Sequence, residues 1–258
     1  MSASLAELRE RRTFECRLEP DRALQSVDDA AAFLDDRGIL TRTPGCSLPS
    51  LFEACHQQPY KAGRGGFAEW PETGYPWFWE IAQLDGVYAL SVHNGKNVLM
   101  STPLAALADP LCRAELAAAE TADSDGARLL QHLASAGPST LNDLKTELEW
   151  DASQLRRARG PLERMGALVS HGVTLPGGDG GHTHSSRLAR WDQVFPSPAS
   201  GGGQDELVVA CVRAAVLAPE AEPARWFSWK PRPDTALLDR LVAEGRLTRP
   251  APGCISVP

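Results

Sequence analysis

Several features that would assign this sequence to a familiar class at once are missing. It has no apolar run near the roughly 20 residues that a membrane helix needs. Its charged start, MSASLAELRERRTFECRL, lacks the apolar core of a signal peptide or an anchor. None of its 6 cysteines forms a Cys-x-x-Cys pair, which argues against a zinc ribbon. No Gly-x-x-x-x-Gly-Lys-[Ser/Thr] motif is present, so a P-loop ATPase is not supported. We therefore expect neither a cofactor nor a metal, and no membrane partner.

An excess of positive charge is also missing. The net charge is −7 and the isoelectric point is about 5.4. Proteins that coat nucleic acid without specificity are usually basic, so the overall charge argues against that role. A local basic face stays compatible with it, because salt screens charges beyond about 8–10 Å. We interpret the scattered cysteines as reduced thiols of a cytoplasmic protein. The abundance of alanine, arginine, glycine and proline suggests a GC-rich bacterial genome.

One short phrase, Leu-x-x-x-Gly-x-Leu, occurs three times. Its copies span residues 34–40, 162–168 and 241–247. Each follows a stretch with helical spacing and precedes a short apolar run. This pattern predicts a helix that ends where glycine adopts the left-handed conformation and the chain turns into a strand.

Two breaks in composition divide the chain. Residues 121–126, TADSDG, are polar, and residues 196–203, PSPASGGG, form a Pro/Ser/Gly linker with no predicted capacity to pack. We expect an α+β fold that is mainly α: tandem winged-helix domains with small β-hairpin wings and a divergent N-terminal segment. The predicted parts are an N-terminal segment, a winged helix, a linker and a second winged helix, at 1–120, 126–195, 196–203 and 204–258.

The two predicted winged helices rest on matching element orders. In the middle segment, three helical stretches precede a strand, a glycine-rich tip and a returning strand, and Asp151 or Ser153 caps the third helix. The C-terminal segment repeats this order, with Asp234 as the cap. Four positions match at one constant offset: Ala158, Leu162, Gly166 and Leu168 align with Leu237, Leu241, Gly245 and Leu247. This spacing is evidence for a tandem repeat.

The N-terminal segment shows three local patterns. Ser26 predicts the start of a helix that stops at Gly38. Residues 67–79 hold a dense group of aromatic residues, which we interpret mainly as core, with a turn at Tyr75-Pro76-Trp77. The run VYALSV-HNGK-NVLMS predicts a β-hairpin with a type I′ turn at Asn94-Gly95.

Candidate DNA-binding residues lie in the middle segment. Its predicted third helix carries a group of arginines: Arg156, Arg157, Arg159 and Arg164. This helix of a winged helix lies in the major groove, and the arginine fork reaches both phosphates and guanine edges. Arg187 and Arg190 on the returning strand are candidates for the flanking backbone. The alternative is a solvated basic face paired with glutamates. The C-terminal copy carries fewer basic residues, which favours a packing or homodimer role.

Two smaller groups are also candidates. His182 and His184 lie in the glycine-rich wing, where they could contact phosphate; without a third ligand they do not predict a metal site. Gln83 and Asp85 flank Leu84. In an extended segment they would face one side and could orient a water, whereas the alternative is a simple turn at Asp85-Gly86.

Taken together, these patterns resemble the AlkZ/YcaQ-like winged-helix family, of which the chain is identified as a shortened member. The resemblance covers the tandem winged helices from about 126 to 257 and the run YPWFWEIAQLDGVYALSVHNGK. Members are DNA glycosylases that excise alkylated bases or unhook crosslinks, with a Gln-apolar-Gln or Gln-apolar-Asp catalytic motif. Gln83-Leu84-Asp85 matches the second form, so the resemblance implies these two polar residues as catalytic.

Three functions stay open at this point. The first is a DNA-binding protein related to the glycosylases, with or without catalysis, whose partner is duplex DNA. The second is an active glycosylase that hydrolyses N-glycosidic bonds. The third is a protein-interaction scaffold, which the acidic charge favours. Burial of the helix at 151–165 against another segment would support the scaffold.

Overall fold

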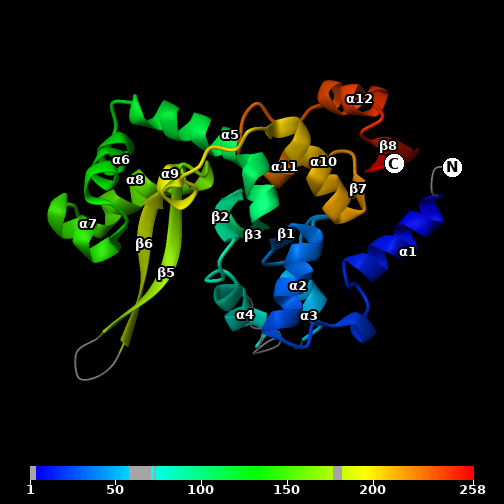
Figure 1. The fold of residues 1–258 in the computed structure, drawn as a ribbon, viewed down its shortest axis with the longest axis horizontal. Coiled ribbons are helices and arrows are strands. Elements are labelled where there is room, and N and C mark those ends of the chain that lie inside the picture. The colour runs from blue at the N-terminus through cyan, green and yellow to red at the C-terminus, as the bar shows by residue number, and fades with distance from the viewer. Residues whose placement is uncertain (1–3, 58–70, 73, 177–181) are drawn as a thin grey trace.

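Three small antiparallel sheets of three strands each organise the chain (Figure 1). The computed structural model describes residues 4–57, 71–72, 74–176 and 182–258. Each sheet belongs to a run of six elements in the order helix, strand, helix, helix, strand, strand. In each sheet the last strand lies between the other two. The fold is therefore α+β with helices predominating.

We name the three runs by their position in the chain. The N-terminal unit comprises α2 (Val27–Arg37), β1 (Ile39–Thr41), α3 (Leu51–Cys55), α4 (Gly74–Ile81), β2 (Val87–His93) and β3 (Lys96–Ser101). The middle unit comprises α6 (Asp125–Ala136), β4 (Ser139–Thr140), α7 (Leu141–Glu147), α8 (Ala152–Arg164), β5 (Leu168–Pro176) and β6 (His182–Arg190). The C-terminal unit comprises α10 (Gln204–Ala215), β7 (Leu217–Pro219), α11 (Pro223–Trp226), α12 (Thr235–Ala243), β8 (Thr248–Ala251) and β9 (Cys254–Ser256).

The other elements connect these units. They are α1 (Leu5–Glu15), the 3₁₀ turn η1 (Pro20–Arg22), α5 (Thr102–Glu120) and α9 (Trp191–Val194). Helix α5 runs from the N-terminal unit to the middle unit, and the β5–β6 hairpin projects away from the body (Figure 1). The predicted divergence of the N-terminal segment is thus wrong in one respect: its elements follow the same order as those of the other two units.

The repeated phrase marks real helix ends. Gly38, Gly166 and Gly245 all have positive φ, at 76°, 73° and 70°. Gly38 follows the first helix of its unit, whereas Gly166 and Gly245 follow the third. The predicted hairpin is also confirmed, because Asn94 and Gly95 both have the positive φ that a type I′ turn requires. The phrase at 34–40 is therefore a helix cap, and the other two copies are structural equivalents.

Buried side chains join the units through α5. One core includes Val92 of β2, Cys112 of α5 and Trp226 of α11, so the N-terminal sheet and the C-terminal unit share it. The middle unit has a core of its own, with Leu130, Leu144 and other apolar residues. All 6 cysteines are free. In the described residues no helix is long and apolar enough to cross a membrane.

The segment at 196–203 touches α5 at Ala199 and at its last two glycines, while residues 196–198 and 200–201 are exposed. Its Ala199 N–H donates to Asp109 Oδ2 of α5 at 2.9 Å, and Gly203 N–H donates to the Leu107 carbonyl at 2.8 Å. A Cβ at Gly202 would lie 2.8 Å from Leu107 Cα. Pro110 cannot donate within α5, so it leaves a carbonyl of the preceding turn without its helical partner. Because Gly202 has no Cβ, the backbone of this segment can approach the backbone of α5 closely.

The aromatic residues of the N-terminal unit form a helix rather than the expected turn. Tyr75, Trp77, Phe78 and Trp79 lie in α4. Phe78 is fully buried and the other three pack against the same core, which agrees with the interpretation as core residues. Phe67 and Trp70 lie outside the described residues.

Gly166→Ala should destabilise the protein more than Gly245→Ala. Both positions have positive φ, which costs alanine about 1 kcal/mol. A Cβ at Gly166 would also lie 2.7 Å from Cys112 Sγ, whereas no atom lies within 4 Å of one at Gly245. Overpacking adds about 1–3 kcal/mol to the first variant. Urea denaturation of both variants measures the difference, and equal losses would show that the Cys112 contact is not tight.

Candidate nucleic-acid interface

Helix α8 separates an apolar face from a basic one. Asp151 caps it by accepting from the Gln154 N–H at 2.7 Å, as predicted. Residues at helical spacing bury one side in the core of the middle unit: Leu155, Ala158 and Leu162. On the opposite side lie the exposed residues Arg156, Arg157 and Arg164. The periodicity that builds the core therefore also lines up the arginines toward solvent.

The Asp151 carboxylate at the start of α8 interacts with the charge of Arg157, but the exposed arginines of this helix form no ion pair in the described residues. Within the described part of the chain, no carboxylate lies within ion-pair distance of Arg156, Arg157 or Arg164; Arg157 donates to Ser153 Oγ at 2.8 Å. Arg159 differs, because it is half-buried and lies 3.8 Å from Glu163. Burial raises the pKa of Glu163, and the Arg159 charge opposes that rise. Arg159 is thus partly engaged, while the other three are free to meet an anion.

The β5–β6 hairpin carries one exposed arginine. Arg187 of β6 is exposed and pairs in register with His171 of β5. Burial lowers the pKa of His171, and the Arg187 charge lowers it further. His182 and His184 lie on β6 opposite Pro176 and Thr174, but their side chains are outside the described set.

Arg190 has a different environment from the one the sequence suggested. Its side chain is only 9% exposed and donates to Asp192 Oδ1 and Oδ2 at 2.9 and 2.7 Å. It also contacts Glu120 at the end of α5 and donates to the Leu130 carbonyl at 3.3 Å. The hydrogen bonds to Asp192 and Glu120 raise the pKa of the Arg190 guanidinium above its usual value. Arg190 therefore ties the middle unit together, and we leave it out of the proposed DNA surface.

Three arginines of the C-terminal unit, on α12, just after it and on β8, are neutralised internally. Arg240 of α12 lies 2.7 Å from Asp205, and Arg246 lies 3.4 Å from Glu206. Arg249 of β8 lies 2.6 Å from Asp239 and also bonds Glu220. The surface around α12 therefore carries arginines, as the surface of α8 does, but carboxylates of the same unit already neutralise them.

Gln83 and Asp85 lie on a turn between α4 and β2. The Gln83 and Leu84 N–H groups donate to the carbonyls of Glu80 and Ile81 at 3.1 and 3.0 Å. This continues α4 as tight turns, so the extended arrangement is wrong and the turn alternative is correct. Gln83, Leu84 and Asp85 are all exposed, and Leu84 is 44% exposed. The turn displays an amide, an apolar side chain and a carboxylate to solvent.

The length of β2 separates this turn from the end of α8. Gln83 and Asp85 precede β2, whereas the Arg164 side chain packs at Gly95, beyond its far end. Seven residues of strand span roughly 20 Å. The structure brings the α8 arginines together but does not bring Gln83 and Asp85 beside Arg164.

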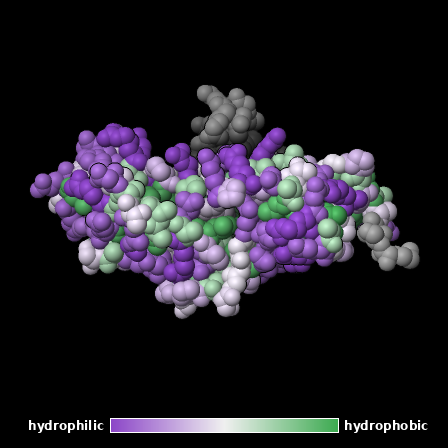
Figure 2. Space-filling view, turned by 90° about the horizontal axis from the view of Figure 1, so that it is seen from above, coloured by the Kyte–Doolittle hydropathy of each residue, from purple (hydrophilic) through white to green (hydrophobic). Residues whose placement is uncertain are grey.

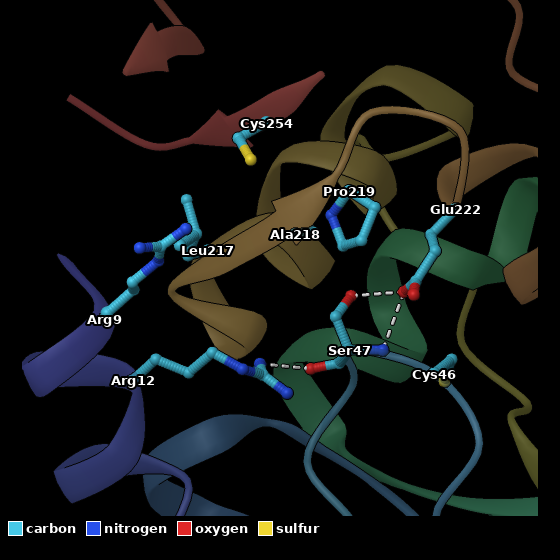
Figure 3. A pocket seen from close by; sticks show the side chains of 9 residues that line it. All are labelled: Arg9, Arg12, Cys46, Ser47, Leu217, Ala218, Pro219, Glu222 and Cys254. Atoms are coloured by element: carbon cyan, nitrogen blue, oxygen red, sulfur yellow. Dashed lines mark hydrogen bonds between the residues drawn. The ribbon is translucent and has the colours of Figure 1, made fainter. Parts of the chain in front are cut away.

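A cavity of about 400 Å³ lies elsewhere, between α1 and the C-terminal sheet (Figure 3). Arg12 donates to the carbonyls of Ser47 and Ala215 at 2.6 and 2.7 Å. The Ser47 N–H and Oγ–H both donate to Glu222 Oε2. These bonds use the polar groups to join α1, the N-terminal unit and the C-terminal unit. No candidate residue lines this cavity, so we assign it a structural role.

Polar residues cover most of the molecule. On the face in Figure 2, hydrophobic residues form small separate groups rather than one broad patch. Phe14 and Leu84 are the exposed large apolar side chains among the described residues, and Phe14 is covered by the Arg22 guanidinium at 3.7 Å. Nor do the described residues contain a group of three or more His, Cys, Asp or Glu side chains that could hold a metal ion.

A family comparison agrees with this architecture. The chain belongs to the family of AlkZ-like DNA glycosylases, whose model matches residues 97–251. The match contains the whole middle unit and most of the C-terminal unit, but it begins after Gln83 and Asp85.

Among solved structures, the fold is similar to that of the DNA glycosylase AlkZ from Streptomyces sahachiroi. The TM-score is 0.53 and the identity is 18%, over 96% of this chain and 67% of that one. A search of curated proteins finds no match.

Sequence reasoning missed one basic group, formed by Lys96 and Arg225. These residues are 129 positions apart in the chain, and they line the same cavity. No local pattern marks either residue. Only the tertiary contact between the N-terminal and C-terminal units brings them together.

Proposed function

We propose that this protein binds duplex DNA, with α8 as the helix that enters the major groove. The main observation is the exposed face of Arg156, Arg157 and Arg164, whose charges have no carboxylate partner in the described chain. Arg187 on the adjacent hairpin extends this surface. Arginine on such a helix serves both phosphate and guanine contacts. Membership in a DNA glycosylase family supports the same partner.

We further propose that the units are winged helices, each with a β-hairpin as its wing. Their shared order and antiparallel sheets support this. The functional parts would then follow the predicted limits of 1–120, 126–195 and 204–258, with 196–203 as a connection. We propose a packing role for α12 and the hairpin of the C-terminal unit, since Arg240, Arg246 and Arg249 are already paired; a homodimer through this surface is compatible with that role.

The scaffold alternative receives less support. It would require α8 to be buried against another segment. Although its C-terminal end packs at Gly95, its arginine face stays open to solvent. A protein-binding surface would also favour apolar contact area, and among the described residues the exposed large apolar side chains are Phe14 and Leu84.

A second candidate function is catalysis of N-glycosidic bond hydrolysis. The observation that favours it is the joint exposure of Gln83 and Asp85 on one fixed turn. Bond cleavage develops positive charge on the sugar, which the Asp85 carboxylate would stabilise while the Gln83 amide orients a water. A duplex that reaches both this turn and Arg164 would span about six base pairs over roughly 20 Å.

Asp85→Asn distinguishes the binder from the enzyme. If the protein is a glycosylase, this variant should release alkylated bases from treated DNA on the order of 100-fold more slowly, because the transition-state charge loses its counter-ion. DNA affinity should change little. Asp123→Asn, an exposed residue between α5 and α6, is the matched control. Base release at the wild-type rate by Asp85→Asn would exclude the assigned role, and no release by the wild-type protein would leave binding alone.

A further inference from the structure

Contacts between the three units meet at the turn between β2 and β3. The Asn94 side-chain amide donates to the Arg225 carbonyl at 2.8 Å, which joins the N-terminal and C-terminal units. The side chain of Arg164, at the end of α8, lies 3.5 Å from where a Cβ of Gly95 would be. Trp229 Nε1–H donates to the Met165 carbonyl at 2.8 Å, so the C-terminal unit also contacts the end of α8. This junction is therefore fixed by contacts from each unit.

Three cations gather at this point, and we call them the junction cluster: Lys96, Arg164 and Arg225. All three are exposed. Lys96 and Arg225 line one cavity of about 250 Å³, together with His93, Asn94 and Glu222. Within the described ranges, none of the three cations has a carboxylate at ion-pair distance.

Glu222 is the one carboxylate that lines this cavity, and it is engaged elsewhere. Its Oε2 accepts from the Ser47 N–H at 2.6 Å and Oγ–H at 2.5 Å, and from Trp226 Nε1–H at 3.3 Å. Three donors on one oxygen fix the carboxylate toward Ser47. The junction cluster therefore keeps an excess of positive charge.

This excess is unusual for a chain with a net charge of −7. The exposed arginines of the C-terminal unit at Arg240, Arg246 and Arg249 all have acidic partners. Gathering like charges costs free energy unless an anion is bound. The same unit also has exposed arginines that form no ion pair in the described residues: Arg213, Arg225 and Arg232. Of these three, Arg225 lines the cavity with Lys96, so two cations in one cavity point to an external anion.

We propose that the junction cluster binds backbone phosphates of duplex DNA beside the segment held by α8. This inference rests on the proposed function. Arg164 belongs both to the α8 face and to the cluster, and it lies 7 residues after Arg157, or about 10 Å along the helix. Charges of one DNA strand are about 3.4 Å apart along the helix axis, so this distance spans about three phosphates. A duplex seated on α8 would therefore continue over Lys96 and Arg225, and the C-terminal unit would touch DNA through its junction edge rather than through α12.

The double variant Lys96→Ala/Arg225→Ala tests this proposal. Binding to a duplex of about 30 base pairs should weaken roughly 10-fold at moderate salt, and the slope of log affinity against log salt should fall by about 2. Hydroxyl-radical protection should shorten at one end of the footprint only. The control Arg240→Ala/Arg249→Ala removes two positive charges from the same unit at paired sites, and it should bind nearly as the wild type does.

The outcomes separate this inference from the proposed function. The junction contact would be overturned if Lys96→Ala/Arg225→Ala kept the wild-type affinity and footprint. If the α8 variants bound more weakly in the same assay, α8 would remain as the DNA site. Equal loss in the control would also overturn it, since overall charge would then explain the effect. If the α8 variants bind normally as well, the proposed function itself fails. Circular dichroism melting confirms that each variant is folded, and Lys96→Gln/Arg225→Gln repeats the test with longer side chains.

Discussion

Replacing Arg156 and Arg157 by alanine should weaken duplex binding roughly 100-fold at moderate salt. Both guanidinium groups are exposed on α8 and have no carboxylate partner in the part of the chain that the structure describes. A hydrogen bond to a charged group contributes about 1.5 kcal/mol or more, so two contacts account for about 3 kcal/mol. Fluorescence anisotropy across a salt series measures both the affinity and its slope, which should fall by about 2.

The control for this variant uses two arginines of the C-terminal unit, one on its third helix and one just after that helix. Arg240→Ala/Arg246→Ala removes the same number of charges from paired positions of the C-terminal unit. We expect its affinity to stay within about 2-fold of the wild type, because its charges are already neutralised. Identical salt curves for the α8 variant and the wild-type protein would contradict DNA binding through this helix. A similar loss in the control would assign the effect to net charge.

The elements that sequence predicts best are those with local signals. Ser26, Asp151 and Asp234 each accept from a backbone N–H at the start of a helix, and each is the cap that its sequence context predicts. The Asn94-Gly95 hairpin follows from the same kind of local chemistry. A further signal, the Ser4 and Glu7 capping box, could have predicted α1 as well.

The similarity of the N-terminal unit to the others could not be predicted in this way. Its β1 has 3 residues and its α3 has 5, which is too short for a hydrophobic period to be recognised. Pairing of β1 with β3 joins segments about 60 residues apart. Gly86, which ends the turn after α4, has a φ of 79° and takes the place of Gly166 and Gly245 without the surrounding leucine phrase.

Only the part of the candidate site that depends on local spacing could be predicted from the sequence. Helical spacing identifies the exposed face of α8 because the apolar face of a helix implies its opposite. The sequence predicted Arg187 and Arg190 on one strand, but it could not show that Glu120, 70 residues earlier, lies against Arg190. Contacts between distant segments thus decide which arginines are available.

Asp109→Ala should destabilise the protein by about 3–5 kcal/mol, a large share of the 5–15 kcal/mol typical of a folded domain. The Asp109 side chain is 2% exposed and accepts from Arg113 Nε at 2.8 Å. It also accepts from Trp191 Nε1–H at 2.7 Å and the Ala199 N–H at 2.9 Å. Alanine would leave these donors unsatisfied and would release the segment at 196–203 from α5.

Urea denaturation followed by tryptophan fluorescence measures this loss. Asp239→Ala is the matched control, because Asp239 is exposed and its partner Arg249 retains Glu220. It should change the free energy of unfolding by about 0.5 kcal/mol or less. The loss of unfolding free energy in Asp109→Asn should lie between those of Asp109→Ala and Asp239→Ala. The amide keeps the shape of the carboxylate, but its NH₂ group is a donor placed where other donors already converge. Equal stability of Asp109→Ala and Asp239→Ala would show that α5 does not hold the middle unit through this carboxylate.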